Sequence, residues 1–194
     1  MRNMVKLFVV VVLFSVVSGS LLAAVRSGTQ ERIEYQQLKF VKGPVLQEIL
    51  EGCSNDPLVD RFKIKDGDRE RDVFVGVFDG KRNTVAFETF GKGYGGDIGV
   101  MVAINLDNDK IVGVGVTTQS ETPGLGARVK TEKDFSAQFK GIAFQGPFKI
   151  RPDGGNVDAV SGASYSSRGV CMALTAAEDA YRRLKPTIMQ KIKA

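Results

Sequence analysis

The chain has 194 residues, of which 43% are hydrophobic and 25% are charged, as expected for one globular domain of ordinary size. It contains no histidine and only two cysteines, which excludes Ser-His and Cys-His nucleophile pairs, His-ligated zinc or haem, and a four-thiolate iron–sulfur cluster. The formal net charge of +5 comes from basic residues scattered among 22 acidic ones, which indicates a solvated surface and no nucleic-acid site.

The N-terminal segment predicts a single membrane anchor. Residues 1–6 carry Arg2 and Lys6 and no acid, and residues 7–25 follow without a charge. As a helix this apolar run would span roughly 28 Å, close to the hydrocarbon thickness of a bilayer. The positive flank places residues 1–6 in the cytoplasm and the rest of the chain outside the cytoplasmic membrane. A cleaved signal peptide is the alternative, but residues 20–24 lack a clean small-x-small cleavage site.

Residues 26–70 are expected to form a stalk and a helical lead-in. Residues 26–37 are polar, Gly43 and Pro44 interrupt the pattern, and residues 45–50 predict a short helix. Residues 63–71 are rich in charge, which is typical of a loop.

From residue 71 onward the hydrophobic pattern becomes that of β-strands. Asp79-Gly80 and the acidic run at residues 107–109 are turn signals between them. Consecutive strands joined by tight turns predict an antiparallel sheet. The expected strands are residues 72–78, 83–90, 98–105 and 111–118.

The remainder of the chain predicts helices around that sheet. Residues 134–139 predict a short helix, residues 144–150 one more strand, and residues 165–184 a helix with apolar residues three and four apart. We expect Pro186 to end this helix. The predicted fold class is α+β: an antiparallel sheet with flanking helices over residues 71–194, preceded by one N-terminal transmembrane helix.

Cys53 and Cys171 leave two possibilities open. They form one disulfide in an oxidising compartment if their Cα atoms come close enough, or they remain two thiols. We favour thiols, because a buried free cysteine behaves as a small apolar residue.

A loop of small residues leads directly into the last predicted helix and reads DAVSGASYSS over residues 158–167. The first amides of a helix lack intrahelical partners, and the helix dipole favours an anion beside them. Gly162 and Ala163 let a ligand approach the backbone, and several hydroxyls gather at the same place. The pattern predicts a phosphate site. The alternative is an ordinary helix start with Ser164 or Ser166 as N-cap.

The same loop resembles the attachment motif D-x-x-S/T-G-A-S/T of the FMN-binding domain family. In that family an enzyme that uses FAD as donor joins FMN, through its phosphate, to the final hydroxyl residue. The resemblance implies a covalent FMN phosphoester on Ser164, where the family usually has threonine, with Ser166 and Ser167 as fallback acceptors. It also implies that Asp158 positions a metal or the acceptor during attachment, although no resident metal site is expected. The matching positions are Asp158, Ser161, Gly162, Ala163 and Ser164.

Two further stretches carry the resemblance. Residues 93–98, GYGGDI, followed by Val102-Ala103-Ile104, resemble the GYGG-x-I strand entry of RnfG and NqrC subunits. Residues 121–126, ETPGLG, resemble the loop that this family places beside the flavin ring. The short chain is more similar to RnfG-type subunits. The loop residues implied as cofactor contacts are Glu121, Thr122, Gly124 and Leu125, with a surface carboxylate as the alternative for Glu121.

The resemblance implies a membrane-anchored electron-transfer subunit of an Rnf complex, which couples electron flow between ferredoxin and NAD⁺ to ion transport. Such a subunit relays electrons through FMN on the outer face of the inner membrane and is not a complete catalyst alone. Its expected partners are the other membrane subunits of the complex and, during maturation, the flavin transferase. The chain itself has no GxGxxG dinucleotide fingerprint. A stand-alone extracytoplasmic FMN-binding redox domain and a non-redox anchored anion-binding adaptor are the alternatives.

Overall fold

The computed structural model describes residues 2–67 and 69–193, which form two units that are described separately: one up to Lys39 and one from Phe40. The first unit is helix α1, Arg2–Gln37, which has no buried residue. By length and composition, Arg2–Ile49 is the one helical stretch among the described residues that could cross a membrane. Residues 26–37, expected as a stalk or helix start, are part of the same helix.

The helix does not break at Gly43 and Pro44. A π-helical turn, Leu38–Lys42, leads into helix α2, Gly43–Ile49, with Pro44 in its first turn. Pro44 has no amide hydrogen to donate, so the backbone ladder lacks one hydrogen bond at this position. The wider i→i+5 bonding of the π turn accommodates the local change in the hydrogen-bond ladder.

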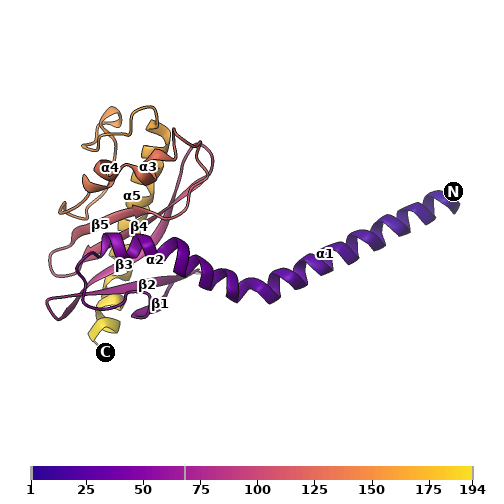
Figure 1. Ribbon diagram of the computed structural model, residues 1–194, viewed down its shortest axis with the longest axis horizontal. Helices are drawn as coiled ribbons and strands as arrows, with labels where there is room; N and C mark the ends of the chain where they lie inside the picture. Colours follow the sequence, from indigo (N-terminus) through magenta and orange to yellow (C-terminus); the bar gives the residue numbers. More distant parts are fainter. Residues whose placement is uncertain (1, 68, 194) are drawn as a thin grey trace. The chain divides into compact units, whose positions relative to one another are not determined.

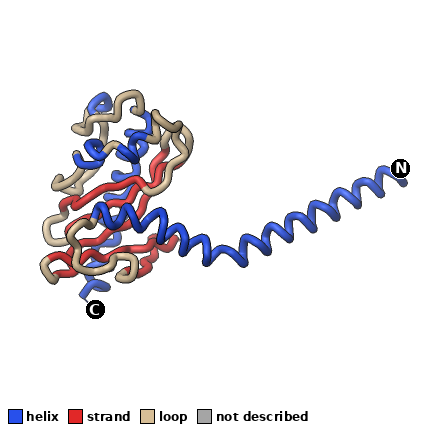
Figure 2. Tube along the Cα trace, viewed as in Figure 1, coloured by secondary structure: helices blue, strands red, loops and turns tan. Residues whose placement is uncertain are grey.

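A five-stranded antiparallel sheet forms the centre of the second unit, as the sequence predicted (Figures 1 and 2). Its strands lie side by side in chain order, and the hairpin between the second and third has Asp79 and Gly80 at positive φ, as an Asp-Gly turn requires. The strands are β1 Arg61–Asp66, β2 Arg69–Phe78, β3 Lys81–Lys92, β4 Asp97–Asn105 and β5 Lys110–Val116.

Strand β1 corrects the expectation of a loop over residues 63–71. The strand has charged residues on its exposed positions and turns Ile64 into the core. Charges on the outer positions of an edge strand discourage pairing with another chain. The charged residues that suggested a loop therefore lie on the exposed positions of an edge strand.

Helices cover both faces of the sheet (Figure 1). Helix α5, Ser164–Lys193, packs on one face, where Thr89 donates a hydrogen bond to the carbonyl of Ala173 at 2.8 Å. Helix α2 packs on the other face, above Gly113 and Gly115. A Cβ on Gly113 would lie 2.8 Å from the carbonyl oxygen of Ile49, so only glycine permits this close approach.

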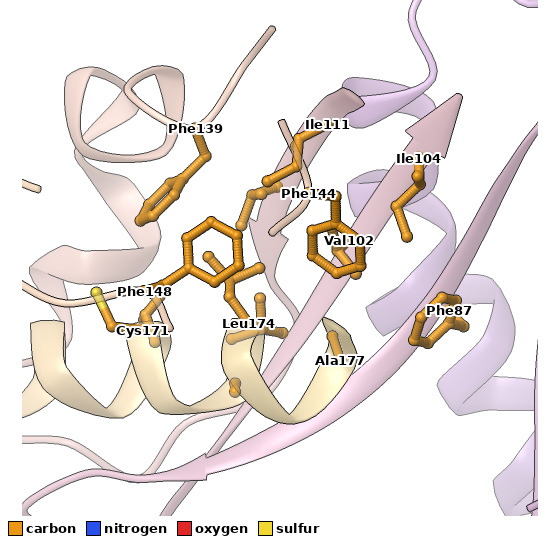
Figure 3. Packing of buried hydrophobic residues seen from close by; sticks show 14 of the residues in the cluster. Phe87, Val102, Ile104, Ile111, Phe139, Phe144, Phe148, Cys171, Leu174 and Ala177 are labelled. Atoms are coloured by element: carbon orange, nitrogen blue, oxygen red, sulfur yellow. The ribbon is translucent and has the colours of Figure 1, made fainter. Parts of the chain in front are cut away.

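The main hydrophobic core lies between the sheet and α5. Burial of each large side chain there contributes about 1.5–3 kcal/mol. Figure 3 shows side chains from the strands, from the segment before α5 and from α5 meeting in this core: Phe87, Val102, Ile104, Ile111, Phe139, Phe144, Phe148, Cys171, Leu174 and Ala177.

Between the sheet and α5 the chain forms two short α-helices, α3 Arg128–Thr131 and α4 Lys133–Ala137, and a 3₁₀ turn, Arg151–Asp153. Helix α4 lies close to the expected helix at residues 134–139. The strand predicted at residues 144–150 does not form, and only isolated bridges occur at Ala143 and Ile150. This segment contributes buried side chains to the core instead of a ladder, and Pro147 has no amide to donate.

Helix α5 continues through Pro186 to Lys193, so the expected end of the helix at this proline is wrong. Beyond the proline, Ile188 is fully buried, and Met189 and Ile192 pack against the core. This apolar burial offsets the one backbone hydrogen bond that proline cannot make.

The two cysteines are free thiols. Cys53 donates a hydrogen bond to the carbonyl of Asn55 at 3.3 Å, whereas Cys171 is buried in the core. Burial, with a smaller contribution from Asp153, raises the pKa of Cys171 to about 12, so its thiol stays protonated at neutral pH.

Candidate functional site

Three segments that are far apart in the sequence meet beside the start of α5. They are the turn between β3 and β4, the loop after β5, and the first turn of α5. Together they enclose a pocket of about 440 Å³, within the range of small-molecule and cofactor sites. The pocket is lined by Tyr94, Glu121, Thr122, Leu125, Gly126, Gly162, Ala163, Ser164, Tyr165 and Ser166.

Six of the nine residues proposed from the sequence line this pocket: Glu121, Thr122, Leu125, Gly162, Ala163 and Ser164. Gly124 lies at the exposed tip of the loop, with a φ of 73° that suits glycine. Ser161 and Asp158 also lie outside the lining. The carbonyl of Ser161 accepts a hydrogen bond from Arg128 Nη1 at 3.0 Å.

Helix α5 presents its N-terminus to the pocket. The amide of Ser167 donates to the carbonyl of Ala163 at 2.9 Å, which places Ala163 at the N-cap position. The amides of Ser164, Tyr165 and Ser166 therefore precede the first intrahelical bond, and this first turn has no acidic residue. The expected alternative, with Ser164 or Ser166 as N-cap, is wrong. The amides and the helix dipole make this end of the pocket suited to an anion.

The three serine hydroxyls of this turn have different surroundings. Ser164 is exposed and lines the pocket. Ser166 is 2% exposed and donates a hydrogen bond to Glu121 Oε2. Ser167 is fully buried, where its hydroxyl donates to the carbonyl of Ala163 and accepts from the amide of Val160, both at 3.0 Å. Ser164 is the one hydroxyl of the three that a ligand can reach without rearrangement.

Glu121 is buried, with only 5% of its surface exposed, so a surface carboxylate is excluded. Its Oε1 accepts from the amide of Gly95 at 2.8 Å, and its Oε2 accepts from the amide of Tyr94 at 3.3 Å and from Ser166. Burial by itself would raise the pKa of Glu121, but these donors hold it below its ordinary value. One ionised carboxylate thus joins all three segments of the site.

One glycine of GYGG and one of ETPGLG pack against this carboxylate. A Cβ on Gly93 would lie 2.5 Å from Glu121 Oε1, and one on Gly126 would lie 2.8 Å from Oε2 and 2.5 Å from the hydroxyl of Ser166. These distances are too short for a real contact. Gly93 and Gly126 are therefore needed by the packing around Glu121, without any contact to a ligand.

Two exposed tyrosines that the sequence reasoning did not select form one wall of the pocket. The rings of Tyr94 and Tyr165 meet edge to face, with centroids 6.2 Å apart. Arg168 lies 5.4 Å from the centroid of Tyr165 and binds both carboxylate oxygens of Asp153, at 2.6 and 2.9 Å. Both tyrosines could have been selected from the sequence, because Tyr94 lies inside GYGG and Tyr165 directly follows Ser164.

Asp158 lies on the outside of the loop. Its carboxylate forms a largely exposed ion pair with Arg151 at 2.7 Å. Its backbone is held by the side chain of Gln138, at 2.7 Å to the amide and 3.0 Å to the carbonyl. Gln138 and Arg128 thus fix the path of the loop, and neither was selected from the sequence.

Comparisons with known proteins identify the family of this chain. Residues 93–179 match the FMN-binding domain family. The chain is 34% identical over 165 residues to RnfG of the ion-translocating oxidoreductase complex from Cereibacter sphaeroides, covering 81% of this chain and 75% of that protein. It is 31% identical over 180 residues to the protein of the same name from Methanosarcina acetivorans, covering 92% and 94%.

Solved structures share the fold. NqrC from the Na⁺-translocating NADH-quinone reductase of Parabacteroides distasonis superposes with a TM-score of 0.58 at 23% identity, covering 78% of this chain and 94% of that one. NqrC of Shewanella oneidensis superposes with a TM-score of 0.52 at 26% identity, covering 70% and 72%.

Proposed function

This chain belongs to the RnfG family of ion-translocating oxidoreductase complexes, and we propose that it carries its FMN covalently, through a phosphoester to Ser164. It is a membrane-anchored, FMN-binding electron-transfer subunit of an Rnf-type complex. The single observation that supports attachment at Ser164 is that this residue, alone among the three serines of the turn, is exposed, at the amides that precede the first intrahelical bond of α5.

The pocket suits the two chemical halves of FMN. The N-terminus of α5 offers amides and a favourable dipole for the phosphate. Leu125, Tyr94 and Tyr165 offer apolar and aromatic surface for the flavin ring. When bound, FMN supplies one- and two-electron chemistry, and the chain's residues hold, orient and partly cover it.

Attachment follows from the position of Ser164. Its hydroxyl oxygen would form a bond to the FMN phosphorus of FAD while the bond to AMP breaks, and the hydroxyl proton leaves with the AMP product or to solvent. No electrons are transferred in this step. A flavin transferase would bind the outside of the loop, where the exposed carboxylate of Asp158 is available to position the acceptor or the transferase's metal.

The orientation of the chain in the membrane is part of the proposal. Residues 7–25 form the transmembrane anchor, residues 1–6 stay in the cytoplasm with Arg2 and Lys6, and residues 26–70 lead to the FMN-binding domain at residues 71–194. The domain then lies on the outer side of the inner membrane. A covalent bond there prevents loss of the flavin to the surroundings.

The test is the intact mass of the full chain co-produced with a flavin transferase and purified in detergent. We expect a mass increase equal to FMN less water, with the modified peptide containing Ser164. Ser164→Ala should lose the adduct, whereas Ser164→Thr should keep it because threonine offers the same nucleophilic oxygen. Ser166→Ala is the matched control and should still carry FMN on Ser164. An unmodified wild-type chain, with active transferase present, would refute covalent attachment.

A further inference from the structure

Glu121 is an ionised carboxylate whose negative charge is stabilised by hydrogen-bond donors. Within the unit that begins at Phe40, the described residues place no lysine or arginine nitrogen within 4.0 Å of it. The donors are the hydroxyl of Ser166 and the backbone amides of the turn Tyr94-Gly95-Gly96. Burial of a charge without a counter-ion is costly in free energy. Because no cation neutralises Glu121, its carboxylate gives this wall of the pocket a negative electrostatic potential.

Glu88 is another largely buried carboxylate of this domain, and its charge is neutralised by a cation. Like Glu121, it accepts a hydrogen bond from a hydroxyl, that of Thr117. Unlike Glu121, it is neutralised by Lys42, whose Nζ lies 2.9 Å from Oε2. Glu88 does not line the pocket. Glu121 therefore differs from Glu88 in two respects: it lines the pocket, and its charge is stabilised by hydrogen-bond donors without a cation.

A fixed anion in a flavin pocket has a defined chemical effect. Uptake of two electrons and one proton by a flavin ring leaves that ring with one more negative charge. A neighbouring carboxylate in a partly desolvated pocket repels this charge more strongly than it would in water. The oxidised form is thereby favoured over the reduced form, which lowers the reduction potential.

We propose that Glu121 holds the bound FMN at a low reduction potential, as a fixed negative charge in the pocket wall. The proposal rests on FMN occupying this pocket, as the proposed function requires. Glu121 acts here as a residue that sets the electrostatic surroundings of the flavin, in addition to joining the three segments. The depressed pKa of Glu121 agrees with this role, because the carboxylate stays ionised at neutral pH.

The test is a potentiometric titration of the full-length, FMN-loaded chain in detergent, with dithionite as reductant and mediator dyes. Glu121→Gln removes the charge, and we expect a more positive midpoint potential. Ser166→Ala removes a donor that disperses the charge, and we expect a more negative one. Glu88→Gln is the matched control, because it removes a partly buried carboxylate outside the pocket, and its potential should equal that of the wild type.

An unchanged or more negative potential in Glu121→Gln would overturn the proposal. If that variant does not fold, because its amide nitrogen would face the backbone amides of Tyr94 and Gly95, then Ser166→Ala decides. A potential that is unchanged or raised by Ser166→Ala also overturns it. The FMN mass adduct is measured on every variant. If Glu121→Gln carries the adduct but has an unchanged potential, the proposed role of Glu121 is refuted and covalent attachment is not affected. If the wild-type chain carries no adduct, the result counts against covalent attachment at Ser164.

Discussion

The side-chain amide of Gln138 pairs with the backbone of Asp158, with Oε1 accepting from the amide at 2.7 Å and Nε2 donating to the carbonyl at 3.0 Å. The two polar atoms of one side chain therefore bind both the amide and the carbonyl of the same residue. The pairing fixes the entry of the loop that ends at Ser164.

Replacement of Gln138 by alanine should loosen this loop. Loss of two hydrogen bonds predicts a destabilisation of about 1–3 kcal/mol. We also expect slower FMN attachment, because the loop samples more conformations before it meets the transferase. Unfolding of the full chain in detergent can be followed by tyrosine fluorescence, since the sequence has no tryptophan. The exposed Gln145, replaced by alanine, is the control, and equal attachment rates in the two variants would contradict the prediction.

The glycine at position 126 should not tolerate a methyl group. Gly126→Ala forces the new Cβ against the hydroxyl of Ser166 and the carboxylate of Glu121, and overpacking of this kind costs about 1–3 kcal/mol. Gly28→Ala, where a Cβ meets nothing within 4 Å in helix α1, should be neutral or slightly stabilising. Denaturation midpoints of the two variants give the comparison, and a neutral Gly126→Ala would show that the carboxylate is not tightly packed.

The pair formed by Lys42 and Glu88 should be cooperative. Lys42→Met leaves Glu88 as an unpaired, mostly buried charge and should cost about 1–3 kcal/mol, between the values for surface and fully buried pairs. Adding Glu88→Gln should recover part of this loss. A double-mutant cycle measures the coupling, and a coupling energy of zero would mean that the two side chains do not interact in solution.

Acid should destabilise the domain partly through Asp66. The hydrogen bond from Arg71, joined by Arg183 of α5, holds the pKa of Asp66 below its ordinary value of 3.8. Its contribution to stability is therefore complete above that value and is lost as the pH falls through the lower pKa of the folded state. Denaturation at pH 7 and at pH 3 should show a smaller loss for Asp66→Asn than for the wild type. Equal losses of stability in the two proteins would show that Asp66 does not contribute to the acid destabilisation.

The sequence was informative about the fold where the pattern of burial is simple. Strands β2 to β5 turn apolar residues to two covered faces, and their composition predicted them. Strand β1 was missed because Arg61, Lys63 and Lys65 suggested a loop, although their alternation with Phe62 and Ile64 is that of an edge strand. The continuation of α5 past Pro186 depends on tertiary burial of Ile188, which no local rule reveals.

The motifs predicted Ser164 and Glu121 as site residues, and both line the pocket, but the contacts of the motif residues could be seen only in the folded structure. The sequence does not show that Ser166 reaches back 45 residues to Glu121, or that Gly93 is needed by a carboxylate. Tyr94 was missed because the glycines on either side of it carried the motif. Gln138 has no local signal, since its partner lies 20 residues away.

The serine proposed to carry the cofactor is positioned by the folded domain and not by its local sequence alone. Ser164 stands in the first turn of α5, a helix that follows the last strand and packs on the sheet. A chain that is unfolded or misfolded would offer a flavin transferase a flexible serine loop without a helix start. We therefore expect the flavin to be added only to domains that have reached their final form, so that the yellow colour of a purified sample reports how much of it is correctly folded.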